Sequence, residues 1–259
     1  MDGEAALNLL QEVAAEAGEL ALRLFGAPGT VEFKPDGTPV TEADRRVDAL
    51  IVARLSAATP DLPILAEEST ADTLEAASDL WIVDAIDGTS AFIEGGDEWV
   101  ISAALARGGR PVAGVLYRPT TGDLYSARQG GGATRNGLSI CVTPGGRVAE
   151  MRYTSAKIPA QYKAYKTVLP GGVKLRNFRS LALRLAQLAE GASEVALVRE
   201  NAGDWDLAAA ELILCEAGGA LTDAQGRPPI YGVPPFRQPF LIGAERVRQA
   251  EVLAAMAEL

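Results

Sequence analysis

An apolar run of strand length leads directly into two carboxylates, Asp84 and Asp87, and this feature constrains the fold of the chain more than any other. A strand that delivers both acids at its exit can direct them, and the backbone carbonyl between them, into one pocket. Oxygen-only clusters of this kind suit a hard cation such as Mg²⁺. Gly88, Thr89 and Ser90 follow and could begin a short helix whose free N–H groups attract a phosphate. Taken alone, the segment is read equally well as an Asp-Gly turn with capping residues.

Further acidic positions favour the first of these interpretations. Glu67 and Glu68 follow the preceding apolar run, where adjacent carboxylates are costly unless something neutralises them. Asp204 and Asp206 begin a later helical pattern, and alone they would be read as capping acids that complement the helix dipole. A further acid, Asp44, lies in the first turn of another predicted helix.

The composition excludes several classes of function. The 259 residues include no histidine, which rules out Ser-His-Asp and Cys-His nucleophiles and His-ligated zinc. Lysine and arginine total 24 against 34 acids, and the net charge of −10 disfavours a nucleic-acid binder. No stretch approaches the roughly 20 apolar residues of a membrane span, and the acidic N-terminus lacks the basic region of a signal peptide, so we expect a cytoplasmic protein. Cys141 and Cys215 are too few for a disulfide scaffold, and we expect both to be buried.

Apolar periodicity predicts a mixed α/β protein. Helical spacing marks residues 4–25, the segment that begins at Thr41, and residues 180–190, 206–217 and 245–257. Short apolar runs predict strands at residues 62–66, 80–83, 99–106, 112–117, 123–127, 195–198 and 240–242. The turn-rich residues 30–40 predict a hairpin or loop. We expect two lobes, residues 1–150 and 151–259, divided near 140–155.

Four blocks in chain order contain these acids: Pro39-Val40-Thr41-Glu42-Ala43-Asp44; Glu67-Glu68-Ser69; Asp84-Ala85-Ile86-Asp87-Gly88-Thr89; and Trp205-Asp206-Leu207-Ala208-Ala209, continuing into Glu216-Ala217-Gly218-Gly219. Together they resemble the lithium-sensitive, Mg²⁺-dependent phosphatases of the inositol monophosphatase superfamily, and the resemblance spans nearly the whole chain. It implies a layered αβαβα sandwich of the inositol monophosphatase and fructose-1,6-bisphosphatase type. It also implies a homodimer.

The resemblance implies a set of ligands for two to three Mg²⁺ ions. Glu67, Asp84 and the carbonyl of Ile86 would hold one ion. Asp84, Asp87 and Asp206 would hold a second, and a third, weaker ion would lie by Glu67 with its waters.

The resemblance also implies which groups act on water and on phosphate. Thr89 and Asp44 would orient the attacking water and help to deprotonate it, and Glu67 is counted among the catalytic groups. The N–H groups at Gly88, Thr89 and Ser90 would hold the phosphate. Metals about 3.5–4 Å apart can activate a water and stabilise the leaving oxygen without histidine.

Two positions depart from the superfamily pattern. Ala85 stands where proline is usual, which removes a backbone constraint but no ligand. Arg179 precedes Ser180 where glycine is usual, a change at the substrate rim. Glu68 is read as a residue that supports the ligands, and its role stays open.

The superfamily divides among inositol monophosphates, 3′-phosphoadenosine 5′-phosphate (PAP) and related bisphosphates, and fructose 1,6-bisphosphate. Residues 92–102 and 109–119 look most like the bacterial 3′(2′),5′-bisphosphate nucleotidase (CysQ-like) branch. Arg199 stands seven residues before Asp206, where the inositol branch commonly has an acid, and arginine suits a second phosphate better than a ring hydroxyl. Glu200 is adjacent, so a shift of one residue reverses this inference.

A basic stretch in the second half is either a solvated surface or a rim that attracts a doubly phosphorylated nucleotide. It contains Lys157, Lys163, Lys166, Lys174, Arg176 and Arg179. The sequence thus predicts a Mg²⁺-dependent phosphatase of a small phosphorylated metabolite, with no nucleic-acid or membrane partner. Bisphosphate nucleotidase is favoured over inositol monophosphatase or a dual specificity that includes fructose 1,6-bisphosphate. A regulatory protein- or RNA-associated factor is the alternative of another class.

Overall fold

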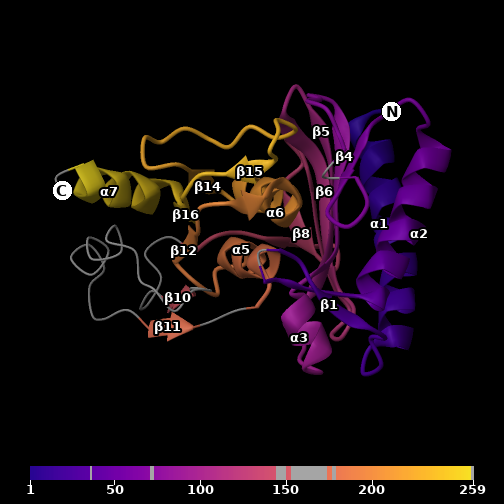
Figure 1. Ribbon diagram of the computed structural model, residues 1–259. Coiled ribbons are helices and arrows are strands. Elements are labelled where there is room, and N and C mark those ends of the chain that lie inside the picture. The colour runs from indigo at the N-terminus through magenta and orange to yellow at the C-terminus, as the bar shows by residue number, and fades with distance from the viewer. Residues whose placement is uncertain (36, 71–72, 144–149, 153–173, 177–178, 258–259) are drawn as a thin grey trace.

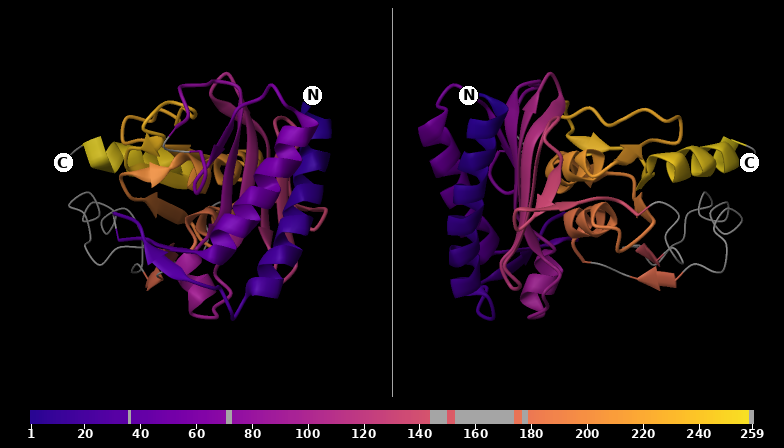
Figure 2. Two further views of the ribbon diagram at one scale, coloured as in Figure 1. Left: turned by 45° about the vertical axis from the view of Figure 1, so that its right-hand side comes forward. Right: turned by 180° about the vertical axis from the view of Figure 1, so that it is seen from behind.

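Helices and sheets alternate in five layers (Figure 1). The structure is a computed structural model that describes residues 1–35, 37–70, 73–143, 150–152, 174–176 and 179–257. Two long helices cover one face of a seven-stranded sheet, and two more lie between that sheet and a five-stranded one (Figure 2). A last helix lies beyond the second sheet. This order of layers confirms the expected αβαβα sandwich.

The outer layer consists of α1 (Gly3–Leu24) and α2 (Glu42–Ala58). A capping box begins α2, as the sequence predicts: Thr41 accepts a hydrogen bond from the N–H of Asp44, and the Asp44 side chain accepts one from the N–H of Thr41. Apolar residues three and four positions apart bury one side of each helix. They include Leu10, Val13 and Ala17 of α1 and Val47, Ile51 and Leu55 of α2.

The seven-stranded sheet has the order β3-β4-β5-β6-β7-β8-β9, in which only β3 and β4 are parallel neighbours. Because helices cover both faces, every residue of β4 is buried. A separate hairpin, β1 (Val31–Phe33) with β2 (Pro39–Thr41), confirms the turn-rich prediction. The sheet strands are β3 (Ile64–Ala66), β4 (Leu80–Asp87), β5 (Val100–Arg107), β6 (Arg110–Arg118), β7 (Asp123–Arg128), β8 (Ala133–Arg135) and β9 (Leu138–Ile140).

The middle layer consists of α5 (Leu181–Ala189) and α6 (Asp204–Glu216). Nearly every residue of α6 is buried, which is typical of a helix enclosed by two sheets. Its backbone approaches β6 so closely that a Cβ at Gly114 would stand 3.0 Å from Cα of Ala209. A side chain at this crossing would require the backbone of α6 to shift by a few tenths of an ångström, so glycine allows the observed close approach.

The second sheet has the order β11-β10-β12-β16-β14, and α7 (Arg246–Ala257) packs on β16 and β14. A short ribbon, β13 (Ala202–Gly203) paired with β15 (Arg237–Gln238), lies at the beginning of α6. No helix in the described part of the chain is long and apolar enough to cross a bilayer. The sheet strands are β10 (Glu150–Arg152), β11 (Lys174–Arg176), β12 (Val195–Val198), β14 (Gly219–Thr222) and β16 (Leu241–Glu245).

The expectation for the cysteines is wrong. Cys141 is exposed because it follows β9, the edge strand of its sheet, and Cys215 is half-buried. Of the basic stretch, Lys157, Lys163 and Lys166 lie outside the described residues. The division into lobes near residues 140–155 stays a prediction.

Candidate active site

The two acids of β4 line the same cavity because the pairing of this strand is irregular. Asp84 pairs with Ser102 of β5 and Asp87 with Val100, so three steps along β4 match two along β5. A regular strand turns residues three apart to opposite faces, and the extra residue of a bulge cancels that reversal. The predicted strand ended before Asp84, whereas the observed strand continues to Asp87 through this bulge.

Three carboxylates from distant parts of the chain meet in this cavity. Glu67, Asp84 and Asp206 each place one oxygen within 4.8 Å of the other two. Burial raises the pKa of Asp84 well above its usual range and that of Asp206 to about 8, and repulsion from neighbouring acids adds to both shifts. Like charges held this closely away from water favour protonation or a bound cation.

The two acids at the beginning of α6, Asp204 and Asp206, have different roles, which the sequence did not distinguish. Asp204 accepts hydrogen bonds from the N–H of Gly232 at 2.8 Å and the side-chain amide of Gln238 at 2.6 Å, so it anchors a loop. Asp206 accepts one from the N–H of Gly203 at 2.8 Å and also lines the cavity. Asp206 is thus both a helix cap and a member of the acidic cluster.

Asp87 faces the beginning of α5. Its carboxylate accepts hydrogen bonds from the hydroxyl of Ser180 at 2.6 Å and from the N–H groups of Ala182 and Leu181 at 2.6 and 3.2 Å. Burial raises the pKa of Asp87 to about 6, and these three hydrogen bonds oppose that shift. Asp87 therefore ties α5 to the cavity wall, and its role as a ligand stays a prediction.

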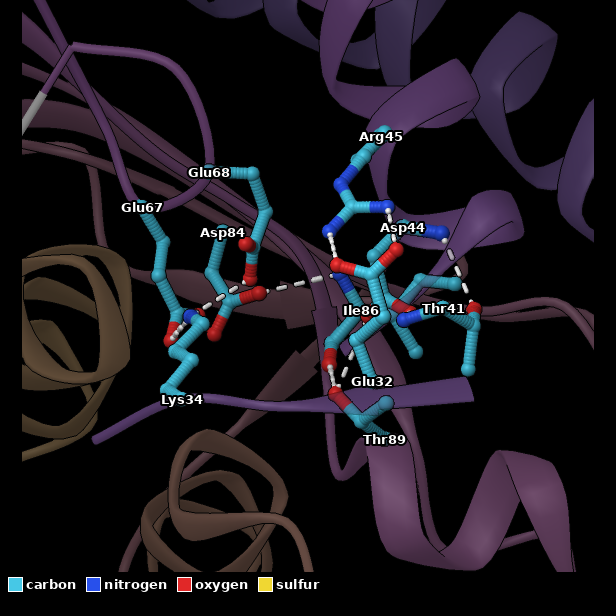
Figure 3. A network of polar contacts seen from close by, with 10 residues as sticks. All are labelled: Glu32, Lys34, Thr41, Asp44, Arg45, Glu67, Glu68, Asp84, Ile86 and Thr89. Carbon is cyan, nitrogen blue, oxygen red and sulfur yellow. Dashed lines mark hydrogen bonds and ion pairs between the residues drawn. The ribbon is translucent and has the colours of Figure 1, made fainter. Parts of the chain in front are cut away.

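A chain of hydroxyl and carboxylate groups lies beside the cluster (Figure 3). The Thr89 hydroxyl is 3.0 Å from Oδ1 of Asp44 and 3.1 Å from the carbonyl oxygen of Ile86. Oδ2 of Asp44 accepts hydrogen bonds from the N–H of Thr41 at 2.8 Å and from its hydroxyl at 2.5 Å. Asp44 is only 2% exposed and contacts Thr89, which lines the cavity, through that hydroxyl. Burial raises the pKa of Asp44, and its hydrogen bonds with Thr41 and Thr89 oppose the shift.

Gly88, Thr89 and Ser90 line the cavity at the beginning of α3 (Thr89–Ile93), the short helix that the sequence predicts. Gly88 has φ +101°, and a Cβ there would stand 2.5 Å from the backbone carbonyl oxygen of Glu98. A residue with a side chain is therefore excluded at the position where the backbone enters the cavity.

Lys34 is a residue of the site that the sequence analysis missed. Its ammonium group forms ion pairs of 2.7 Å with both Glu67 and Glu68 (Figure 3). Desolvation opposes the charged form, yet the two carboxylates raise the pKa of Lys34. Burial and the nearby Glu67 raise the pKa of Glu68 to about 7. The lysine lies in the hairpin turn, which the sequence identified only as a turn, so no local signal indicated its contact with the acids.

The cavity has a volume of about 750 Å³, and its rim is basic. Arg179, Arg199 and Arg237 all line it, and so does Glu200. Arg179 forms an ion pair of 2.9 Å with Glu94, whereas Arg199 and Glu200 are both exposed in the loop after β12. Since both loop residues line the cavity, the choice between them that the sequence posed stays open. Arg237 was not identified from the sequence.

The chemistry of the donors fits one or more divalent cations. All members of the cluster are carboxylates, the ligand type that Mg²⁺, Mn²⁺ and Ca²⁺ prefer. Two of them, Asp84 and Asp206, have raised pKa values, which a bound cation would lower. Lys34 neutralises part of the charge of Glu67. The arrangement can bind a cation next to a hydroxyl, backbone N–H groups and a basic rim.

The layered fold and its carboxylate cluster have the features of a metal-dependent hydrolase. The chain belongs to the inositol monophosphatase family, whose model matches residues 2–258. Members of this family hydrolyse phosphate esters.

Relatives with different specificities are about equally similar. An inositol-1-monophosphatase from Mesorhizobium japonicum is 33% identical over 250 residues, covering 87% of this chain and 88% of the relative. The 3′(2′),5′-bisphosphate nucleotidase CysQ from Aggregatibacter actinomycetemcomitans is 31% identical over 247 residues, covering 86% and 87%. The solved structure of an IMPase from Thermotoga maritima superposes with a TM-score of 0.80 at 29% identity, covering 98% of this chain and 96% of that one. These similarities identify the family and leave the substrate unassigned.

Proposed function

We propose that this chain is a Mg²⁺-dependent phosphomonoesterase that releases phosphate from a doubly phosphorylated nucleotide such as PAP. The observation that carries the proposal is the convergence of Glu67, Asp84 and Asp206 beside Thr89 in one basic-rimmed cavity. The negative charge of the protein is no obstacle, because bound cations would dominate the field at the cluster.

Two to three Mg²⁺ ions are proposed, held by Glu67, Asp84, the Ile86 carbonyl, Asp87 and Asp206. When bound, they would supply charge neutralisation for the ester and a more acidic water. The role of Asp87 as a ligand requires its carboxylate to keep or exchange its hydrogen bonds with α5. A homodimeric, cytoplasmic enzyme is part of the proposal on the family resemblance alone.

Thr89 and Asp44 are proposed to orient the attacking water and to accept its proton. The Thr89 hydroxyl has one proton and two acceptors within reach, Asp44 and the carbonyl of Ile86. When it donates to Asp44, its free lone pair can accept a hydrogen bond from a water in the cavity. Asp44 keeps this orientation because Thr41 holds its other oxygen. The N–H groups at Gly88, Thr89 and Ser90 are proposed to bind the phosphoryl oxygens.

The choice of substrate rests on the rim. Arg199 favours a second phosphate, and similarity to a bisphosphate nucleotidase agrees with it. Inositol monophosphatase is the second candidate because Glu200 also lines the cavity and could accept hydrogen bonds from ring hydroxyls. The same carboxylate cluster would serve both reactions.

The test is phosphate release by the purified protein with Mg²⁺, with PAP, inositol 1-phosphate and fructose 1,6-bisphosphate at equal concentrations. A kcat/KM preference for PAP is expected. A preference for inositol 1-phosphate would keep the carboxylate site and overturn the substrate assignment. No release from any of the three would remove the catalytic proposal and favour a regulatory role.

A further inference from the structure

Arg237 lines the cavity, and its guanidinium group stacks on an aromatic ring. The carbon at the centre of its guanidinium group is 4.3 Å from the centre of the Trp205 ring. Trp205 itself is nearly fully buried and directly precedes Asp206 of the carboxylate cluster. The arginine thus stands on an aromatic platform joined to the carboxylate cluster.

The backbone around Arg237 is held by several contacts. Arg237 pairs with Gly203 in the β13–β15 ribbon, and the N–H of Asp204 donates to the carbonyl of Phe236 at 3.0 Å. The next residue, Gln238, donates its side-chain amide to Asp204 at 2.6 Å and to the carbonyl of Ile230 at 2.9 Å.

Gly203 leaves the space that the stack of Arg237 on Trp205 occupies. A Cβ at Gly203 would stand 2.7 Å from the indole nitrogen of Trp205 and 2.8 Å from Nη1 of Arg237. A side chain at Gly203 would therefore displace the Trp205 ring or the Arg237 guanidinium, and glycine leaves room for their stack.

Arg237 differs in its ion pairing from two other positively charged residues of the cavity, Lys34 and Arg179. Lys34 is paired with Glu67 and Glu68, and Arg179 is paired with Glu94. Among the residues that the structure describes, Arg237 forms no ion pair within 4.0 Å. A guanidinium that stacks on an indole keeps its N–H groups at the edge, where they can bind an anion in a bidentate manner.

We propose that Arg237 is a specificity-determining residue that binds a second anionic group of the substrate, a phosphoryl group other than the one that is hydrolysed. This inference rests on the proposed function. Stacking on Trp205 lowers the conformational entropy that the Arg237 side chain loses on binding, because the side chain is already oriented before the ligand binds. Arg199 and Arg237 are both exposed, and of the two Arg237 is the one that stacks on an aromatic ring. The second phosphate therefore binds mainly to Arg237.

The experiment compares two ligands that differ only in the second phosphate, PAP and adenosine 3′-monophosphate. Arg237→Gln removes the charge and Arg237→Lys keeps it without the planar fork. Arg23→Gln, an exposed arginine of α1 that does not line the cavity, is the matched control. Phosphate release with Mg²⁺ gives kcat and KM. Calorimetric titration with Ca²⁺ in place of Mg²⁺ gives binding without reference to turnover, and circular dichroism checks folding.

For Arg237→Gln we expect KM and Kd for PAP to rise about 10- to 100-fold. The kcat for PAP, and KM and Kd for adenosine 3′-monophosphate, should change less than about twofold. Arg237→Lys should fall between the wild type and Arg237→Gln. An equal loss on both ligands, or an unchanged preference for PAP, would overturn the inference and leave the phosphatase proposal standing. If the wild type releases phosphate from neither ligand, the proposed function fails, and the calorimetric preference still decides whether Arg237 binds the second phosphate.

Discussion

The two walls of the cavity differ in how their side chains are held. The wall built from β3, β4 and α2 places Asp84 and Asp44 almost out of contact with solvent, with hydrogen bonds to backbone groups and to Thr41. The wall built from residues 199–203 and β15 presents Arg199 and Arg237 to solvent. Replacing a buried acid such as Asp84 removes a carboxylate from the cluster, whereas exposed rim residues can change without altering the cluster.

This difference suggests a division of labour. Changes on the buried wall should affect every substrate alike, because they alter the groups proposed to act on the reacting phosphate. Changes on the exposed wall should affect substrates unequally. The following predictions test that division, and they begin with the largest expected effect.

Asp84→Asn should lower kcat/KM by at least about 1,000-fold on every phosphate ester tested, because it removes a carboxylate that is proposed to hold two cations. Asp84 is a sharper choice than Asp87, whose hydrogen bonds hold the beginning of α5. Without metal, the variant should be as stable as the wild type or more so, since a repelling charge is removed from the cluster. A loss confined to one substrate would refute the division between the walls.

Thr89→Val should lower kcat by about 100-fold or more with little change in KM, because it removes the hydroxyl that links Asp44 to the cavity. Thr89→Ser is the matched control, since it restores the hydroxyl at the same position. Steady-state kinetics with Mg²⁺ on two substrates measures both constants. A serine variant as impaired as the valine variant would show that packing of the methyl group, not the hydroxyl, matters.

The stability of the metal-free protein should depend on pH through Asp206. Its folded-state pKa of about 8 lies above the ordinary value of 3.8, mainly because of burial, so the folded state binds the proton more tightly than the unfolded state. The free energy of unfolding should therefore fall as pH rises from about 4 to about 8. Asp206→Asn should reduce this fall, and saturating Mg²⁺ should stabilise the wild type most near pH 8. The measurement is thermal unfolding between about pH 4 and about pH 8, with and without chelator. If stability depends on pH equally in the wild type and in Asp206→Asn, the prediction is contradicted.

Lys34→Met should lower the free energy of unfolding of the metal-free protein by about 1 kcal/mol, because Glu67 and Glu68 lose their shared cation. The difference should shrink in saturating Mg²⁺, when bound ions neutralise the same acids. Arg54→Met removes the exposed pairs with Glu12 and Glu16 and is the control, with no expected dependence on Mg²⁺. Urea denaturation with chelator and with Mg²⁺ compares the two variants, and equal effects in both conditions would remove Lys34 from the site.

The order of layers and most elements follow from local patterns. Thr41 and Asp44 predict the beginning of α2, and the apolar run before Asp84 predicts β4, because caps and apolar periodicity act within a few residues. The bulge that turns Asp84 and Asp87 to one side leaves no comparable pattern, since it depends on pairing with β5. The exposure of Cys141 was missed for a similar reason, because the position of β9 at a sheet edge is decided by strand order.

The sequence by itself determined the family, through four short acidic blocks whose residue types and spacing match it along the whole chain. Only the tertiary structure decided which acids meet: Glu67, Asp84 and Asp206 converge, Asp204 anchors a loop, and Asp87 faces α5. It also brought Lys34 to the acids and Arg237 onto Trp205. Both contacts join residues far apart along the chain. Such contacts depend on how layers pack, which no local spacing encodes.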